Sequence, residues 1–188
     1  EHAWRSNRAK ELVFFLLNNP GKSAEEIASQ LWPELSPAKA TSNFHINLFR
    51  ARRAISPGII IQENGRYNFS SEVELWYDVT EFEKQLREIN RLAPEERGLI
   101  TEHVIDLYKG ALLPGFDSEW INEKRYDLEN KYLKLLFVMV GQYAKRGNME
   151  KVVSLVERVL DTNSDDDEVY YQGIQAYLAL GNSLSASH

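Results

Sequence analysis

A chain of 188 residues has room for one large or two small domains, each with its own hydrophobic core. The chain contains no cysteine, which excludes disulfides and thiolate nucleophiles or metal ligands. No apolar run approaches the ~20 residues of a membrane span, and no signal peptide is visible at the start, so we expect a cytoplasmic protein without a membrane partner.

The net charge of −6 is divided unevenly along the chain. Residues 1–70 contain nine Lys and Arg against six Asp and Glu, a balance of +3, and residues 71–188 contain thirteen against twenty-two, a balance of −9. This asymmetry predicts that the N-terminal part binds nucleic-acid phosphate and that the C-terminal part contacts a different kind of partner. Because the basic surplus is modest, we expect DNA affinity to depend on dimerisation or on a partner.

Three helices are predicted in the first 55 residues. An apolar helix over residues 8–19 ends at an Asn-Asn-Pro-Gly stop signal. Ser23 and Glu26 have the spacing of a capping box, which begins a second helix that ends at Pro33. A third helix is predicted over residues 36–55, with Ser36 as its N-cap and Pro37 in its first turn.

The third helix carries the candidate DNA-contacting side chains. Apolar residues spaced four, three and four apart mark its buried face: Phe44, Leu48, Ala51 and Ile55. At about 100° per residue, polar residues occupy an adjoining flank and the end of the helix: Lys39, Asn43, Asn47, Arg50, Arg52 and Arg53. Asn and Arg can make paired hydrogen bonds to adenine and guanine edges in the major groove, so this flank is a candidate base-contacting surface.

A β-hairpin is predicted directly after the third helix. Ile59–Ile61 and Tyr67–Phe69 have strand composition, and Asn64-Gly65 between them supplies the positive φ angles of a tight turn. Three helices followed by a hairpin predict a winged-helix DNA-binding domain over residues 1–71. The alternative is a surface helix with a solvated basic face.

Two further residues of the third helix leave their roles open. Phe49 lies toward the outer side, where a polar group is expected, and it either touches a thymine methyl group or packs on a neighbour. His45 lies beside the polar flank, and contact with backbone phosphate is the less favoured of its interpretations.

The remaining sequence predicts a helical C-terminal domain. Helices are expected from about residue 78, from about residue 94 to 109, and from about residue 117 to 146. Three residues then recur at a distance of 34: Tyr143, Gly147 and Asn148 return as Tyr177, Gly181 and Asn182. Two helices, over residues 150–162 and 165–180, would fill that period, which is typical of tetratricopeptide repeats. We therefore predict a mainly α protein whose residues 77–188 form a tetratricopeptide-like domain.

Several stretches resemble known families. WRSNRAKELVFFLLNNPGKSAEEIASQLWP, NFHINLFRARRAI and GRYNFS resemble the winged-helix, helix-turn-helix domain of OmpR/PhoB-type response regulators. WYDVTEFE and LYKGALLPGFDSEW, with the long helix after them, resemble the bacterial transcriptional activator domain. The two in tandem are similar to the antibiotic-regulatory-protein (SARP) activators, and the resemblance covers nearly the whole chain.

This resemblance implies a sequence-specific double-stranded-DNA-binding transcriptional activator. The third helix would enter the major groove, and the hairpin would act as a wing at the minor groove or backbone. Carried over by position, it implies base or phosphate contacts from Asn43, Asn47 and Arg50. It implies phosphate contacts from Arg52 and Arg53 near the end of the helix, and wing contacts from Arg66 and Asn68. The helical domain would support a homodimer or bind RNA polymerase or another transcription protein.

Two departures from the family pattern concern the ends of the chain. Only EHAW precedes the first helix, where the family has a small antiparallel sheet, and the last repeat is short by about one helix. The chain also begins at Glu1 without Met, so we expect it to be a fragment of a longer regulator.

No catalytic motif is found in the sequence. It has no glycine-rich phosphate loop, no His-Glu-x-x-His and no Ser-His-Asp set in a meaningful context, so we expect neither an enzyme nor a cofactor. The Asp165–Asp167 run lacks the alternating spacing of a calcium loop, and we interpret it as the carboxylates of a helix start. The rival function is a protein-interaction scaffold that does not bind DNA, which would not need the basic balance around the third helix and hairpin.

Overall fold

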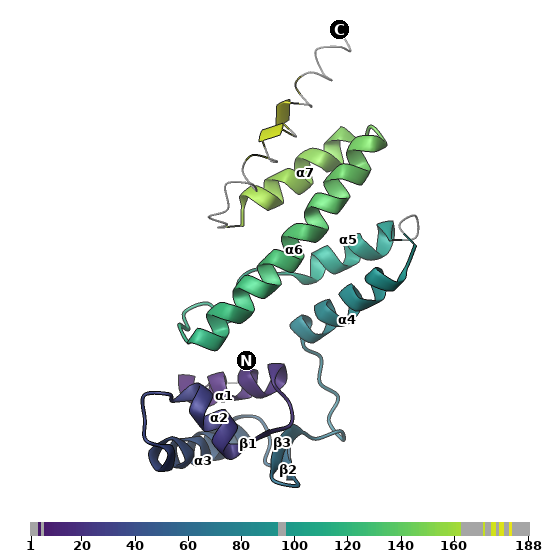
Figure 1. Cartoon of the computed structure of the whole chain (residues 1–188). Helices are drawn as coiled ribbons and strands as arrows, with labels where there is room; N and C mark the ends of the chain where they lie inside the picture. Colours follow the sequence, from purple (N-terminus) through teal and green to yellow (C-terminus); the bar gives the residue numbers. More distant parts are fainter. Residues whose placement is uncertain are drawn as a thin grey trace. The chain divides into compact units, whose positions relative to one another are not determined.

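The computed structural model describes residues 4, 6–93 and 97–162, together with residues 171, 174, 175, 177, 178 and 181 (Figure 1). The chain divides into two compact units, residues 1–76 and 77–188. None of the helices in the described part is long and apolar enough to cross a membrane. The prediction of a mainly helical protein is confirmed, with one small sheet in the N-terminal unit.

The N-terminal unit consists of three helices and a three-stranded antiparallel sheet. Its elements in chain order are α1 (Asn7–Asn18), β1 (Lys22–Ser23), α2 (Ala24–Leu31), α3 (Pro37–Ala54), β2 (Ile60–Glu63) and β3 (Arg66–Phe69). The strand order is β1-β3-β2, with Lys22 opposite Tyr67 and Ile60 opposite Phe69. The sheet therefore ties the segment before α2 to the hairpin that follows α3 (Figure 1).

Local sequence signals fix the ends of these elements. The predicted capping box is confirmed, because the Ser23 hydroxyl accepts from the Glu26 N–H and the Glu26 carboxylate accepts from the Ser23 N–H. The hairpin turn is also confirmed, with φ of 51° at Asn64 and 78° at Gly65. Ser36 occupies the predicted N-cap of α3, but its side chain makes no capping hydrogen bond.

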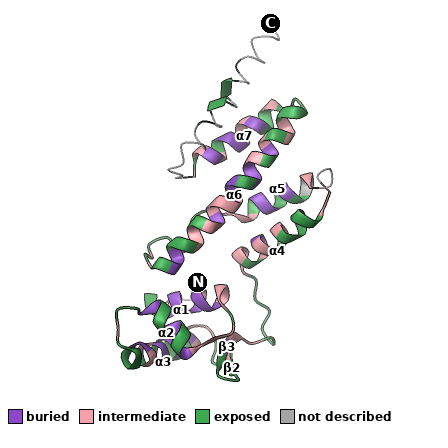
Figure 2. Cartoon of the chain, in the orientation of Figure 1, coloured by how far each residue is buried: buried purple, intermediate pink, exposed green. Residues whose placement is uncertain are grey.

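The core of the N-terminal unit is built from all three helices and the sheet. Figure 2 shows buried stretches on each of α1, α2 and α3. The largest fully buried side chains of this unit are Leu12, Leu16, Ile27, Phe44 and Ile60. The Phe44 and Tyr67 rings meet edge to face with their centroids 4.8 Å apart, which joins the middle of α3 to the central strand. One face of α3 is thereby fixed against the unit, and the opposite face is turned to solvent.

The regular elements in the described part of the C-terminal unit are all helices. It contains α4 (Asp78–Arg91), α5 (Gly98–Leu107), α6 (Glu119–Lys145) and α7 (Met149–Leu160). Its core gathers side chains from all four helices, among them Phe82, Val104, Leu136 and Val159. The predicted helix start near residue 94, the predicted helix over residues 165–180 and the Asp165–Asp167 run lie outside the described residues, apart from five single positions of that helix.

The turn between α6 and α7 explains part of the repeated sequence. Gly147 adopts a φ of 71°, the left-handed conformation that ends a helix, and Asn148 caps α7 by accepting a hydrogen bond from the Lys151 N–H at 3.2 Å. The Gly-Asn pair therefore stops one helix and starts the next.

Two arginines hold the C-terminal unit together. Arg125 donates to the backbone carbonyls of Leu112 at 2.6 Å, Leu113, and Phe116 at 2.9 Å, and so orders the turn before α6. Arg158 links α7 to the other helices through Tyr132 Oη and the Asp106 carboxylate, at 3.0 and 2.8 Å. The sequence patterns predict neither role.

Candidate nucleic-acid interface

The solvent-facing side of α3 is the candidate interface. We define the outer face of α3 by its exposed residues with polar, charged or large apolar side chains: Lys39, Ser42, His45, Ile46, Phe49, Arg50 and Arg53. The buried residues occupy the opposite side: Ala40, Phe44, Asn47, Leu48 and Ala51. Spacings of three, four and seven residues place Ser42, Ile46, Phe49 and Arg53 at the centre of the outer face. The sequence-based flank is therefore displaced from the true centre.

Asn47 does not belong to the exposed flank, which corrects the sequence-based placement. It is 5% exposed; its Nδ2 donates to the Asn43 carbonyl at 2.9 Å, and its Oδ1 accepts from Ser6 Oγ at 3.4 Å. Ser6 is also the N-cap of α1, where it accepts from the Ala9 N–H. The start of α1 thus lies against this flank, and the Asn47 amide joins α3 to α1 instead of facing a ligand.

Arg52 is engaged in holding the hairpin. Its Nε and Nη2 donate to the Ile60 carbonyl at 3.0 and 2.6 Å, so the guanidinium fixes the first residue of β2 to the last turn of α3. The side chain is half-buried. The structure therefore gives Arg52 a positioning role, and its predicted phosphate contact stays a prediction.

The other predicted cations of α3 are open to solvent. Lys39 and Arg50 are exposed, and the Arg53 guanidinium lies over the Phe49 ring with its carbon 5.7 Å from the ring centroid. Ion pairs in the described part of the N-terminal unit use different cations, namely Arg8, Lys22 and Arg66. Since described carboxylates neutralise none of the three, Lys39, Arg50 and Arg53 are available to an anionic ligand.

The two predicted wing residues differ in exposure, but both lie near Gly21. Arg66 is exposed, but its Nη1 donates to the Gly21 carbonyl at 2.6 Å and lies 3.5 Å from the Glu26 carboxylate. Asn68 is half-buried in the central strand, near Gly21. Both side chains therefore face the loop before β1, and a DNA contact by either competes with this packing.

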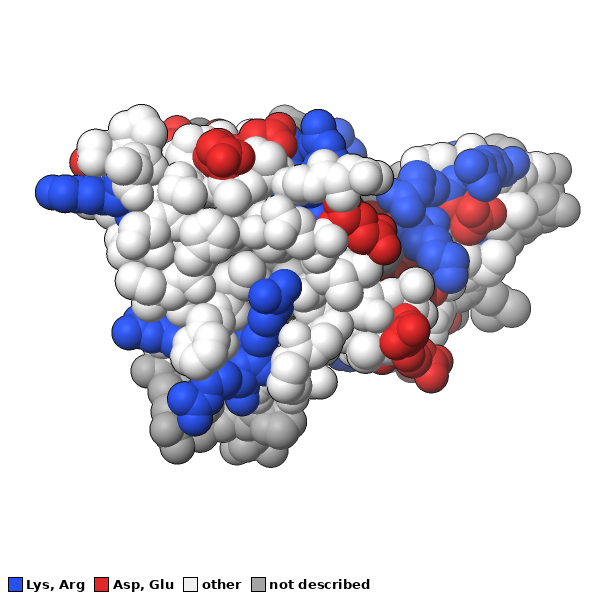
Figure 3. All heavy atoms as spheres, turned by 90° about the horizontal axis from the view of Figure 1, so that it is seen from below, with Lys and Arg blue, Asp and Glu red and all other residues white. Residues whose placement is uncertain are grey.

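The charge of α3 is uniform in sign. Its 18 residues include four Lys and Arg and no Asp or Glu. The nearest acidic residue in the sequence is Glu34, three residues before the start of α3. At the start of α2, hydrogen bonds from the backbone and from Ser23 lower the pKa of Glu25. The space-filling view of Figure 3, taken from below Figure 1, shows Lys and Arg side chains in separate groups on a largely uncharged surface. The positive character is local and modest.

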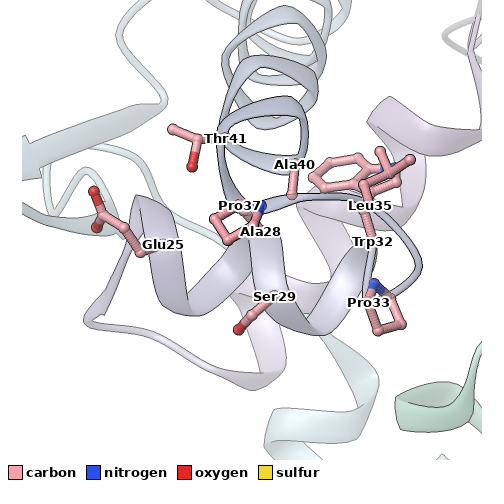
Figure 4. Close-up of a pocket in the computed structure, with 9 residues that line it drawn as sticks. All are labelled: Glu25, Ala28, Ser29, Trp32, Pro33, Leu35, Pro37, Ala40 and Thr41. Atoms are coloured by element: carbon pink, nitrogen blue, oxygen red, sulfur yellow. The ribbon is translucent and has the colours of Figure 1, made fainter.

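A pocket of about 300 Å³ lies between α2 and the start of α3. Figure 4 shows its lining side chains, which are mostly apolar and include the Trp32 ring, with Glu25 among them. The lining contains no Lys or Arg, so it has no group suited to binding phosphate. We do not include this pocket in the nucleic-acid interface.

Some features of the outer face had been missed in the sequence. Ser42 and Ile46 were not singled out, although both follow from rotating the helix until Ala40 and Phe44 point inward. Ala40, 3% exposed, is the signal that could have found them, because a small buried residue shifts the inferred core side of a helix. Because Asn47 is polar, the sequence pattern places it on the exposed side, which shifts the inferred outer face toward α1.

The two units define a mainly helical protein, with a solvent-facing basic helix in one unit and a packed four-helix core in the other. Residues 77–187 match the family of the bacterial transcriptional activator domain, and the match begins at the first residue of the C-terminal unit. The chain belongs to this family, which indicates a role in transcription activation. No curated protein matches the chain. The N-terminal unit lies outside the family match.

Proposed function

We propose that the protein is a transcriptional activator that binds specific double-stranded DNA through its N-terminal unit. In this proposal the unit is a winged helix of the OmpR/PhoB type, α3 enters the major groove, and the β2–β3 hairpin lies beside it as the wing. The C-terminal unit would bind RNA polymerase or another transcription protein, or a second copy of the chain. The family membership of residues 77–187 supports the activator half of the proposal.

The outer face of α3 is the feature that supports the proposed binding of DNA. An 18-residue helix is about 27 Å long, and it presents exposed Lys and Arg side chains with no carboxylate of its own. The B-DNA major groove, about 12 Å wide, admits one α-helix, and its edges are lined with phosphates. A solvated basic face would explain the charges, but it would not explain why Arg52 and the sheet fix the hairpin beside the same helix.

The proposal assigns different tasks to the predicted site residues. Arg50 and Asn43 would contact base edges, and Lys39 and Arg53 would contact phosphates. Asn47 and Arg52 would position α3 and the hairpin. Arg66 and Asn68 would be secondary wing contacts, since both are already packed near Gly21.

The test is selection of a binding sequence followed by substitution of Arg50. The 188-residue chain is incubated with a random-sequence duplex pool, the bound fraction is sequenced, and the enriched duplex is used in fluorescence anisotropy titrations. We expect Arg50→Ala to weaken binding to that duplex by roughly 1–3 kcal/mol, the cost of losing a base-contacting arginine. Arg87→Ala is the matched control, because Arg87 is exposed on α4 of the C-terminal unit; we expect its affinity to be unchanged.

Two outcomes would count against the proposal. Equal losses for the Arg50 and Arg87 variants would remove α3 from the binding surface. Failure to enrich any sequence at low salt would favour the rival, a protein-interaction scaffold in which the exposed apolar residues of α3 meet a protein. We propose no catalytic activity for either unit.

A further inference from the structure

The centre of the outer face of α3 is apolar, although its surroundings are basic. Ile46 and Phe49 are 46% and 61% exposed, and they lie three residues apart on one side of the helix. The packing of α3 against its own unit does not need them, because Phe44, Leu48 and Ala51 fill the buried side. Two large apolar side chains are therefore exposed to solvent on the same face as the cations Lys39, Arg50 and Arg53.

The cations around this pair restrict the ligand. The Arg53 guanidinium lies 5.7 Å from the centre of the Phe49 ring, and Arg50 and Lys39 are exposed on the same face. A ligand that fits this face has small apolar groups to contact Ile46 and Phe49, and negative charges beside them to contact the cations. The major groove of DNA has this arrangement, since the C5-methyl group of thymine projects into a groove bordered by phosphates.

The spacing of the two side chains also fits DNA. Three residues of α-helix correspond to a rise of about 4.5 Å, and successive base pairs are about 3.4 Å apart. Side chains at this separation reach methyl groups on neighbouring base pairs, so the contact would specify a short A·T segment and not a single pair.

We propose that Ile46 and Phe49 contact the C5-methyl groups of thymines on adjacent A·T base pairs and so determine part of the binding sequence. This inference rests on the proposed function and makes it more specific. Arg50 and Asn43 would specify the flanking pairs through hydrogen bonds, and Arg53 would stack on Phe49 and reach a phosphate. The apolar contact supplies sequence discrimination that the phosphate contacts cannot supply.

The experiment replaces thymine by deoxyuridine, which removes the methyl group and leaves base pairing unchanged. Each thymine of the enriched duplex is replaced singly, and the affinity of the 188-residue chain is measured by fluorescence anisotropy at constant salt. We expect about fourfold weaker binding at each of two adjacent A·T pairs, the factor for one methyl-sized group buried in an apolar contact. Replacement at other thymines should leave the affinity unchanged.

Substitutions then assign each methyl group to a side chain. We expect Ile46→Ala to abolish the sensitivity at one of these thymines and Phe49→Ala to abolish it at the other. Phe49→Leu, which retains an apolar side chain, should keep part of the sensitivity, and Arg87→Ala should keep all of it. Both α3 residues are exposed, so these variants are expected to fold, and the deoxyuridine comparison needs no variant at all.

The outcomes separate this inference from the proposed function. Specific binding that is insensitive to deoxyuridine at every thymine, or an enriched duplex without adjacent A·T pairs, would overturn the inference and leave DNA binding intact. Sensitivity that persists in both alanine variants would overturn the assignment to Ile46 and Phe49. Absence of binding to any duplex would overturn the proposed function and the inference together.

Discussion

Asn43 and Asn47 lie one helical turn apart on α3, but their environments differ. Asn43 is partly exposed next to the outer face, whereas Asn47 is buried and bonded to Ser6 Oγ and to the Asn43 carbonyl. The amide of Asn47 satisfies polar groups of the protein itself, and an amide in that position contributes to stability. The side-chain amide of Asn43 is partly exposed and can form hydrogen bonds with a DNA base.

This contrast gives a crossed prediction for the two asparagines. We expect Asn47→Ala to lower the free energy of unfolding by about 1–3 kcal/mol, because a buried polar partner is lost, while the DNA affinity of the folded protein stays nearly unchanged. We expect Asn43→Ala to leave stability within about 0.5 kcal/mol and to weaken DNA binding. Urea unfolding and anisotropy titration of both variants test this. The opposite assignment of effects would show that Asn47 contacts DNA.

The sequence patterns predict the residues that end helices and turns, and the predicted buried face of α3 is confirmed at Phe44, Leu48 and Ala51. They do not predict that Asn47 is buried as well. The capping box and the Asn-Gly turn depend on a few neighbouring residues, so local rules are sufficient for them. The burial of Asn47 depends on where the start of α1 packs, which the periodicity of α3 does not contain. The roles of Arg52 and Arg125 were missed for a related reason, since their partners are backbone carbonyls distant in sequence.

At the scale of elements, Arg125 orders the turn between α5 and α6. This turn includes all but the first residue of the stretch LYKGALLPGF, which carries much of the family resemblance. Leu113 within it has a φ of 48°, which is uncommon for a residue with a side chain. Three backbone carbonyls converge on one guanidinium, so a single substitution frees all of them.

We expect Arg125→Ala to destabilise the C-terminal unit by about 1.5–3 kcal/mol, the range for hydrogen bonds to a charged group. Lys134→Ala is the matched control, because Lys134 is an exposed cation on the same helix. Thermal unfolding followed by circular dichroism measures both. Equal effects of the two substitutions would mean that the turn does not depend on Arg125.

A charged cluster joins α4 to α6 and predicts a pH dependence. Glu83 Oε1 lies 2.8 Å from the Nζ atoms of both Lys124 and Lys131. Partial burial opposes ionisation of Glu83, but hydrogen bonds from Lys124 and Lys131 outweigh it and lower its pKa below the ordinary value of 4.5. The stabilisation is therefore complete above about pH 4.5 and is lost as the pH falls through the lowered pKa.

Glu83→Gln should remove this acid sensitivity. We expect the variant to be less stable than the original protein at pH 7 and to lose less stability between pH 5 and pH 3, two values chosen to bracket about 4.5. Glu88→Gln, a substitution at an exposed carboxylate on the same helix, should follow the original protein. Melting temperatures across this pH range test the prediction, and parallel curves for all three proteins would contradict it.

At the scale of the whole molecule, charge and family membership divide between the two units. The basic helix lies in the N-terminal unit, and the acidic remainder coincides with the bacterial transcriptional activator domain. A modest surplus of basic residues can support DNA binding only where these residues are concentrated. Four of the nine Lys and Arg residues in residues 1–70 lie on α3. In the proposed function, DNA affinity therefore comes from one helix face and depends on salt.

The most direct test is the salt dependence of binding to a random-sequence duplex, measured by fluorescence anisotropy for the original chain and for Arg53→Ala. We predict that affinity falls steeply as salt rises, and that the variant binds more weakly with a log–log slope lower by about one, because one phosphate contact is lost. Binding that is absent at the lowest salt, or an identical slope for the two proteins, would contradict the claim that the outer face of α3 binds DNA.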